Sequence, residues 1–220
     1  MINQGSLIGV DWAVNKKNLE KDIEILQSNY DKVANKQLQY PSYYLKPFHA
    51  YGNTIYHYYP SLLSSLLSLL PLSLLDEGNL SFDAAIEVES AALTVHAPIF
   101  VPKGELSVNG DFELRDRFHS NMKKNFNEQG FKPKRILDIG CSTGLSTIKL
   151  HESFPDSEII GLDLSPYMLS VAKYNLEFNA KYATARSSVS YIHGSGEEST
   201  LGKNDVDLVS MCLVMFPTYY

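Results

Sequence analysis

The apolar positions before residue 130 repeat at the spacing of helices. Residues 18–34, 81–96 and 111–129 each place apolar side chains three and four positions apart, which lines one face of a helix. Ser81 is a suitable N-cap for the second of these helices, and Gly130 is suited to end the third. For the third helix we predict a buried face made of Leu114, Phe118, Met122 and Phe126.

After residue 134 the pattern changes to short apolar runs that alternate with amphipathic segments. The predicted strands cover residues 135–139, 158–162, 188–193 and 206–213, and the predicted helices cover residues 144–154 and 166–179. Strand–helix–strand units of this length form a parallel sheet, so the sequence predicts an α/β, Rossmann-like fold. The run 206–213 is apolar on both faces, as in a strand at the centre of a parallel sheet.

Residues 61–75 consist only of Ser, Leu and Pro. The run is shorter than the roughly 20 residues that a membrane span needs, and Pro71 interrupts it. We therefore expect no stable membrane span, while a membrane or interfacial segment over residues 55–75 stays open. All three amino acids have codons made of pyrimidines alone, so the other reading is that residues 52–75 are a low-complexity insertion or a retained intron.

Composition narrows the classes of partner and site. The chain has 220 residues and a formal net charge of −6, without the basic surface that nucleic-acid binding requires. Its two cysteines, Cys141 and Cys212, are far apart in apolar contexts, which indicates free thiols and neither a disulfide framework nor a zinc site. The histidines show no metal-ligand spacing, so we predict no metal site. Residues 1–10 lack the pattern of a secretory signal or transit peptide. Either the protein is cytoplasmic, or its natural start lies upstream and a chloroplast leader precedes this sequence.

The strongest chemical signal is the segment 136–144, which joins a strand to a helix. Gly140 and Gly144 allow a sharp turn and a close approach to a ligand, and the helix that follows directs its N–H groups toward it. A nicotinamide dinucleotide site would need G-x-G-x-x-G, but counted from Gly140 the second and third positions hold Ser142 and Leu145. A phosphate-binding P-loop is excluded because no Gly-Lys-Ser/Thr follows.

The segment instead resembles motif I of class I S-adenosylmethionine-dependent methyltransferases, an acid-x-Gly-x-Gly-x-Gly loop. Asp138, Gly140 and Gly144 match this motif, while Ser142 stands at the middle glycine. The resemblance implies that Asp138 orients the methionine part of S-adenosylmethionine, through water or through the amino group. It also implies that the loop, including Cys141, contacts this cofactor.

A second acid, Asp163, follows Asp138 by 25 positions at the end of the next predicted strand. A carboxylate at this offset can accept two hydrogen bonds from ribose hydroxyls, and the adjoining Leu164 belongs to the same predicted site. Ser165 is a suitable N-cap for the next helix, and Pro166 suits its first turn.

Two further segments complete the predicted cofactor site. Ser195, Gly196 and Glu197 lie where the resemblance places adenine contacts, although a plain turn with surface acids would have the same sequence. Met211 and Cys212, in the last strand, would lie beside the sulfonium and its methyl group. An apolar wall suits this chemistry, because methyl transfer depends on in-line alignment of the nucleophile.

The resemblance covers residues 134–216 and is closest to plant methyltransferases related to the ubiquinone/menaquinone-biosynthesis type. It implies a sheet of seven strands in the order 3-2-1-4-5-7-6, of which the sequence contains four. We therefore expect an incomplete, C-terminally truncated fold with the fourth strand as an exposed apolar edge. In this division, residues 1–130 are a helical extension and residues 131–220 are the cofactor-binding domain.

These observations predict S-adenosylmethionine-dependent methyl transfer to a small-molecule acceptor, with this chain carrying mainly the cofactor-binding half. The alternatives are a truncated, non-catalytic product with residual cofactor binding and, disfavoured by the glycine spacing, a nicotinamide-dependent oxidoreductase. The sequence assigns neither a catalytic base nor an oligomeric state. By residue type alone, the candidate bases are His119, Tyr191 and His193.

Overall fold

The computed structural model describes residues 8–45, 78–103, 105–198 and 201–212. The chain forms two compact units. The helical unit comprises residues 1–23, 40–112 and 215–220, and the sheet unit comprises residues 24–39 and 113–214. These limits differ from a division at residue 130, because residues 24–39 and 113–130 join the sheet unit. The domain boundary given by the sequence stays a prediction.

The helical unit contains α2 (Trp12–Lys21) and α7 (Phe82–His96), which pack against each other. Lys16 forms an ion pair with Glu87, and the Asn15 side-chain amide donates to Ser90 Oγ over 3.3 Å. As predicted, Ser81 is the N-cap of α7, since its hydroxyl accepts a hydrogen bond from the Ala84 backbone N–H.

The single helix predicted over residues 18–34 is two helices in the structure. The first, α2, ends at Asp22, and α3 (Ile23–Val33) begins directly after it. An acid is unfavourable at the C-terminal end of one helix and favourable at the N-terminal end of the next, so Asp22 suits this break. Within the sheet unit, α3 packs on α10 (Pro166–Phe178): the Ser170 hydroxyl donates to the Leu26 carbonyl over 2.6 Å, and the rings of Tyr30 and Tyr167 are 4.8 Å apart.

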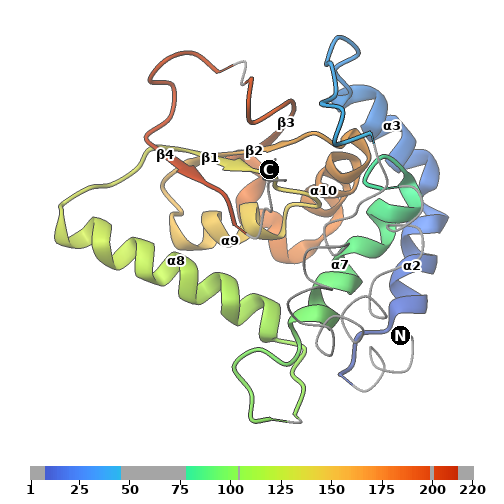
Figure 1. Ribbon diagram of the computed structural model, residues 1–220, viewed down its shortest axis with the longest axis horizontal. Coiled ribbons are helices and arrows are strands. Elements are labelled where there is room, and N and C mark those ends of the chain that lie inside the picture. The colour runs from blue at the N-terminus through green and yellow to red at the C-terminus, as the bar shows by residue number, and fades with distance from the viewer. Residues whose placement is uncertain (1–7, 46–77, 104, 199–200, 213–220) are drawn as a thin grey trace. The chain divides into compact units, whose positions relative to one another are not determined.

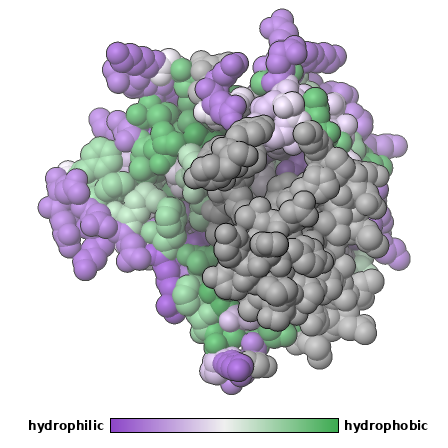
Figure 2. All heavy atoms as spheres, viewed as in Figure 1, coloured by the Kyte–Doolittle hydropathy of each residue, from purple (hydrophilic) through white to green (hydrophobic). Residues whose placement is uncertain are grey.

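Four parallel strands form the sheet, in the order β3-β2-β1-β4 (Figure 1). They are β1 (Arg135–Ile139), β2 (Glu158–Asp163), β3 (Val189–His193) and β4 (Leu208–Ser210). This order is the predicted 3-2-1-4 arrangement, with β4 at one edge. The strand predicted over residues 206–213 covers only Leu208–Ser210 among the described residues. Val209 and Met211 are about half exposed there, and Figure 2 shows apolar residues at the surface over β4.

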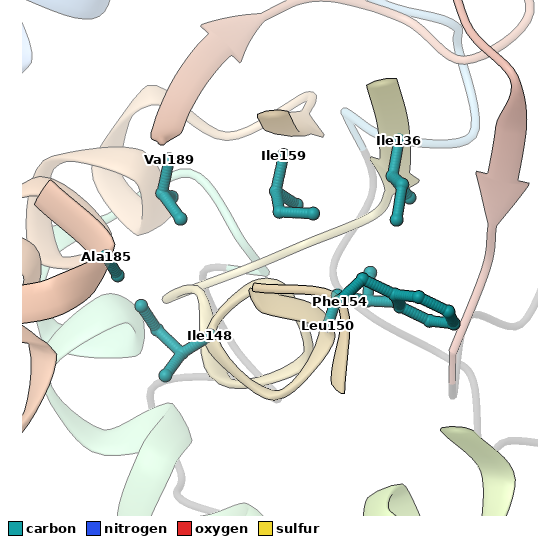
Figure 3. Close-up of a cluster of buried hydrophobic side chains, with 7 residues drawn as sticks. All are labelled: Ile136, Ile148, Leu150, Phe154, Ile159, Ala185 and Val189. Carbon is teal, nitrogen blue, oxygen red and sulfur yellow. The ribbon is translucent and has the colours of Figure 1, made fainter. Parts of the chain in front are cut away.

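The two faces of the sheet carry separate apolar clusters. Figure 3 shows β-strand side chains pointing toward α9 (Leu145–Ser153), in a cluster made of Ile136, Ile148, Leu150, Phe154, Ile159, Ala185 and Val189. On the opposite face, Leu137, Ile160 and Leu162 form a second cluster. Successive side chains of a strand point to opposite faces of the sheet, so neighbouring residues of β1 and of β2 belong to different clusters. A 3-10 helix, Ala180–Ser187, precedes β3 and was not predicted.

Helix α8 (Gly110–Glu128) exists where the sequence predicted a helix, but its buried face is different. Phe118 is 43% exposed, whereas Arg115 and His119 are buried, and Met122 and Phe126 pack against the core. The predicted apolar face is therefore wrong in its first half, where the buried stripe is polar. Gly130, with φ of +65°, ends the helix as predicted.

No helix among the described residues is long and apolar enough to cross a membrane. The run 61–75, and the insertion or retained intron predicted over residues 52–75, lie outside the described residues.

Candidate functional site

The predicted cofactor residues lie on four segments that follow the carboxyl ends of the four strands. Because the strands are parallel, these ends share one edge of the sheet. Ligands of open α/β sheets bind at this edge. The fold therefore brings together segments that are far apart in the sequence.

The loop after β1 is built around left-handed backbone. Gly140, Ser142 and Gly144 have φ values of 69°, 50° and 89°, a region that favours glycine. Ser142, at the position where the motif has its middle glycine, thus carries a backbone cost of about 1–2 kcal/mol. Its backbone N–H donates to Asp163 Oδ2 over 2.8 Å, which holds the residue in this conformation.

Gly144 is the N-cap of α9 and lies against Tyr191 and Ala172. A Cβ atom at this position would collide with the Tyr191 hydroxyl. The same ring covers Gly161 of β2, where a Cβ would lie 2.7 Å from Tyr191 Cδ1. Burial raises the pKa of the Tyr191 hydroxyl well above its ordinary value. Tyr191, a candidate base by residue type, is therefore a packing residue that lies against Gly144 of the glycine loop and Gly161 of β2.

Asp138, the strand-end acid, is completely buried. Its Oδ2 accepts hydrogen bonds from the hydroxyls of Ser146 (2.7 Å) and Thr147 (2.8 Å) in α9. Burial raises the pKa of Asp138 to about 6, although these two bonds and the charge of Arg115 act in the opposite direction. Its Oδ1 has no hydrogen-bond partner among the described residues.

Ser210 repeats this feature on the neighbouring strand. It pairs in register with Asp138 across β1 and β4, is 2% exposed, and its hydroxyl also lacks a partner within the described part of the chain. Side chains of paired residues project from the same face of a sheet. Ser210 could not be predicted from the sequence, because only the strand register places it beside Asp138.

Arg115 is the second residue that sequence reasoning missed. It lies on the buried side of α8, with its Nη1 4.0 Å from the Cys212 sulfur, and its charge lowers the pKa of Asp138. Burying a guanidinium and a carboxylate is costly, and proteins rarely do so without a reason. Ionisable groups in such surroundings cluster at functional sites, so the pair indicates a ligand site. The only sequence signal for Arg115 is its spacing of four residues from His119, which places both side chains on one face of a helix. The residues around them are mostly polar, so the sequence does not show that this face is the buried one.

Asp163 is the last residue of β2 and connects two loops. Its Oδ2 accepts from the Ser142 backbone N–H, and its Oδ1 accepts from the Ser165 backbone N–H, each over 2.8 Å. Ser165 is the N-cap of α10 and Pro166 lies in its first turn, both as predicted.

His193 is held by backbone groups on both ring nitrogens. The Asn35 backbone N–H donates to Nδ1 over 2.7 Å, and Nε2 lies 3.0 Å from the Leu164 carbonyl oxygen. Burial lowers the pKa of this imidazole. His119, the third candidate base, is fully buried, and burial and the charge of Arg115 lower its pKa to about 4. Neither histidine lies open to a substrate as a base would.

The turn after β3 packs against the end of β1. A Cβ at Gly196 would lie 2.7 Å from Ile139 Cγ2, so this position accommodates only glycine without a shift. The buried hydroxyl of Ser195 accepts from the Glu197 backbone N–H over 3.1 Å, and the Glu197 residue is exposed. After β4, Met211 is exposed, whereas the buried Cys212 faces Arg115.

Comparison with known proteins agrees with this geometry. Residues 136–219 match the family model of a methyltransferase domain. Over 76 residues the chain is 41% identical to an uncharacterized methyltransferase of Emericella nidulans, covering 30% of this chain and 26% of that protein. Over 44 residues it is 48% identical to the trans-aconitate 2-methyltransferase of Methylobacterium radiotolerans, covering 20% of this chain and 17% of that protein.

A third relative is the malonyl-(acyl-carrier protein) O-methyltransferase of Halalkalibacterium halodurans, 39% identical over 67 residues that cover 30% of this chain and 22% of that protein. The chain therefore spans about a quarter or less of the length of the curated relatives that it matches.

Proposed function

We propose that the carboxyl edge of the sheet binds S-adenosylmethionine for methyl transfer to a small-molecule acceptor, because residues 136–219 match the family model of a methyltransferase domain and the predicted cofactor residues gather at this edge. The closer resemblance to plant enzymes of the ubiquinone/menaquinone-biosynthesis type stays a prediction. The acceptors named for the relatives are not carried over, since the matched segments are short.

The observation that carries the proposal is the pair of buried polar atoms at the ends of β1 and β4. Asp138 Oδ1 and Ser210 Oγ lack partners among the described residues, and such atoms are costly unless a ligand or water completes their hydrogen bonds. An ammonium group supplies three donors, which suits a carboxylate and a hydroxyl that lie side by side. The guanidinium of Arg115 supplies the positive charge that a carboxylate needs. Together the three residues fit the α-amino acid end of S-adenosylmethionine.

The rest of the edge suits the nucleoside part of the same molecule. Asp163 is rigidly held and can accept from ribose hydroxyls. The turn formed by Ser195, Gly196 and Glu197 would face the adenine. The cofactor, when bound, supplies an activated methyl group, and the residues of this chain bind and orient it. Met211 and Cys212 would border the site of transfer, and no side chain described here is assigned as a base.

Calorimetric titration of S-adenosylhomocysteine into the purified chain tests this proposal. We expect micromolar binding that is weakened in Asp138→Asn and unchanged in Asp156→Ala, where an exposed acid far from the predicted site is removed. Absence of binding to a folded protein would mean that the similarity of residues 136–219 to methyltransferases reflects ancestry and not activity of this chain. A nicotinamide dinucleotide should produce no binding heat, and an assay of methyl transfer from S-adenosylmethionine would separate catalysis from residual cofactor binding.

A further inference from the structure

His193 connects three segments that the sequence keeps far apart. It is the last residue of β3, and its ring reaches Asn35, just after α3, and Leu164, just after β2. His193 is a buried residue, and both of its hydrogen bonds are partly buried. All three segments belong to the sheet unit.

The two hydrogen bonds determine which ring nitrogen carries the proton. A backbone N–H can only donate, so Nδ1 must accept from Asn35, and a carbonyl oxygen can only accept, so Nε2 must donate to Leu164. The ring is therefore the neutral Nε2–H tautomer. It bridges one donor and one acceptor of the backbone.

We propose that His193 is a positioning residue that ties the segment after α3 to the turn carrying Asp163, and that this tie holds the ribose-binding carboxylate in place. Its effect on cofactor binding rests on the function proposed above. The tie itself does not, because it joins described residues without any ligand.

The contacts around Asp163 show how the tie reaches the site. Leu164, whose carbonyl His193 holds, lies between Asp163 and Ser165 in sequence. Asp163 accepts from the backbone N–H of Ser165 and of Ser142, so a displacement of Leu164 would disturb both bonds. The loop after β1 and the turn after β2 would loosen together.

The other end of the tie is fixed as firmly. Helix α3, which precedes Asn35, is joined to α10 by the hydrogen bond from the Ser170 hydroxyl to the Leu26 carbonyl and by the contact between Tyr30 and Tyr167. Leu26 is completely buried. His193 thus links the N-terminal part of the sheet unit to the nucleoside end of the proposed site.

Two conservative substitutions separate the two hydrogen bonds. His193→Asn can keep an acceptor near the position of Nδ1 and loses the donor to Leu164, whereas His193→Gln can keep a donor near Nε2 and loses the acceptor for Asn35. His193→Phe removes both. Asn35→Pro removes the backbone N–H that donates to the ring, and Asn35→Ala, which retains that N–H, is its control.

The first readout is amide hydrogen exchange of the ligand-free protein. We expect faster exchange over residues 35–39 in His193→Gln, over residues 36–39 in Asn35→Pro, and at Ser165 in His193→Asn, with secondary structure retained. The second readout is calorimetric affinity for S-adenosylhomocysteine, which should fall about tenfold in His193→Phe and His193→Asn and remain close to wild type in His193→Gln.

Unchanged exchange at both segments in every folded variant would overturn the tie. Equal affinities of the variants and the wild type would overturn its role in positioning Asp163. If no variant and no wild-type protein binds S-adenosylhomocysteine, the proposed function fails, and the exchange experiment alone decides whether His193 ties the segments.

Discussion

At the scale of single residues, Asp138 is a completely buried carboxyl group, and this burial disfavours its ionised form. Its folded pKa of about 6 lies above the ordinary value of 3.8, so between these two values the folded state binds more protons than the unfolded state. Protonated Asp138 therefore stabilises the folded state relative to the unfolded chain below pH 3.8, and this contribution is lost as the pH rises through about 6. At pH 7 the ionised group costs folding free energy on the order of 3 kcal/mol.

Asp138→Asn should separate stability from binding. The amide oxygen can still accept from Ser146 and Thr147, so we expect the variant to be at least as stable as the wild type at pH 7. Its affinity for S-adenosylhomocysteine should fall roughly 10- to 100-fold, because a hydrogen bond to a charged group is lost. Thermal unfolding and calorimetry measure the two effects. A variant with unchanged affinity would contradict the placement of the ammonium group at Asp138.

Asp163→Ala should weaken cofactor binding more severely. The substitution removes a proposed acceptor of the ribose hydroxyls, at a cost of roughly 2–5 kcal/mol in binding free energy. It also removes the acceptor of two backbone N–H groups, those of Ser142 and Ser165. Calorimetric titration should show the loss, with Asp156→Ala as the control for removing one negative charge. Wild-type affinity in Asp163→Ala would refute the ribose assignment.

At the scale of elements, the start of α9 depends on the absence of a side chain at Gly144. Two glycines of this chain allow a matched comparison: Gly130 and Gly144 both have left-handed backbone, but a Cβ at Gly130 would meet nothing within 4 Å. Gly130→Ala should therefore cost only the backbone strain, about 1–2 kcal/mol of unfolding free energy. Gly144→Ala should cost more, because the new Cβ also collides with Tyr191.

A second substitution identifies the cause of the Gly144→Ala defect. Tyr191→Phe removes only the hydroxyl that the new Cβ would meet, so the double variant should recover part of the lost stability and cofactor affinity. Chemical denaturation and S-adenosylhomocysteine titration of the single and double variants measure this recovery. If Gly144→Ala and Gly130→Ala were equally mild, the close packing of the loop on Tyr191 would be wrong.

The elements that sequence reasoning predicted correctly are those whose signal is local. Strand ends marked by Asp138 and Asp163, the N-caps Ser81 and Ser165, and the helix end at Gly130 all follow from residue type and spacing. The orientation of α8 was not predictable in this way, because the buried Arg115 and His119 look like ordinary surface residues in an amphipathic pattern. The roles of Ser210 and Asn35 depend on strand register and on a contact over 158 positions, neither of which a local pattern contains.

At the scale of the whole molecule, buried ionisable groups link the sheet unit's stability to pH. Burial of the His119 ring disfavours its protonated form, and the positive charges of Arg115 and Lys149 act in the same direction. A hydrogen bond to the backbone of Lys149 and the carboxylate of Asp116 act in the opposite direction but more weakly. The folded protein therefore holds this ring neutral at pH values where an unfolded chain would protonate it.

The sign of the effect follows from this difference in proton binding. The pKa of His119 falls from 6.5 to about 4 on folding, so below pH 6.5 the unfolded state binds more protons and folding stability falls as the pH is lowered, by up to about 3 kcal/mol at pH 4. Asp138 acts in the opposite direction over an overlapping range, so the wild-type curve alone does not isolate His119. His119→Leu does, because it replaces a buried, ionisable ring with an apolar group. Urea unfolding should give a difference between variant and wild type that grows in favour of the variant from pH 7 to pH 4. A difference independent of pH would mean that the pKa of His119 is the same in the folded and unfolded states, as for a ring in contact with water, and the packing of α8 on the sheet unit would need to be looser than described.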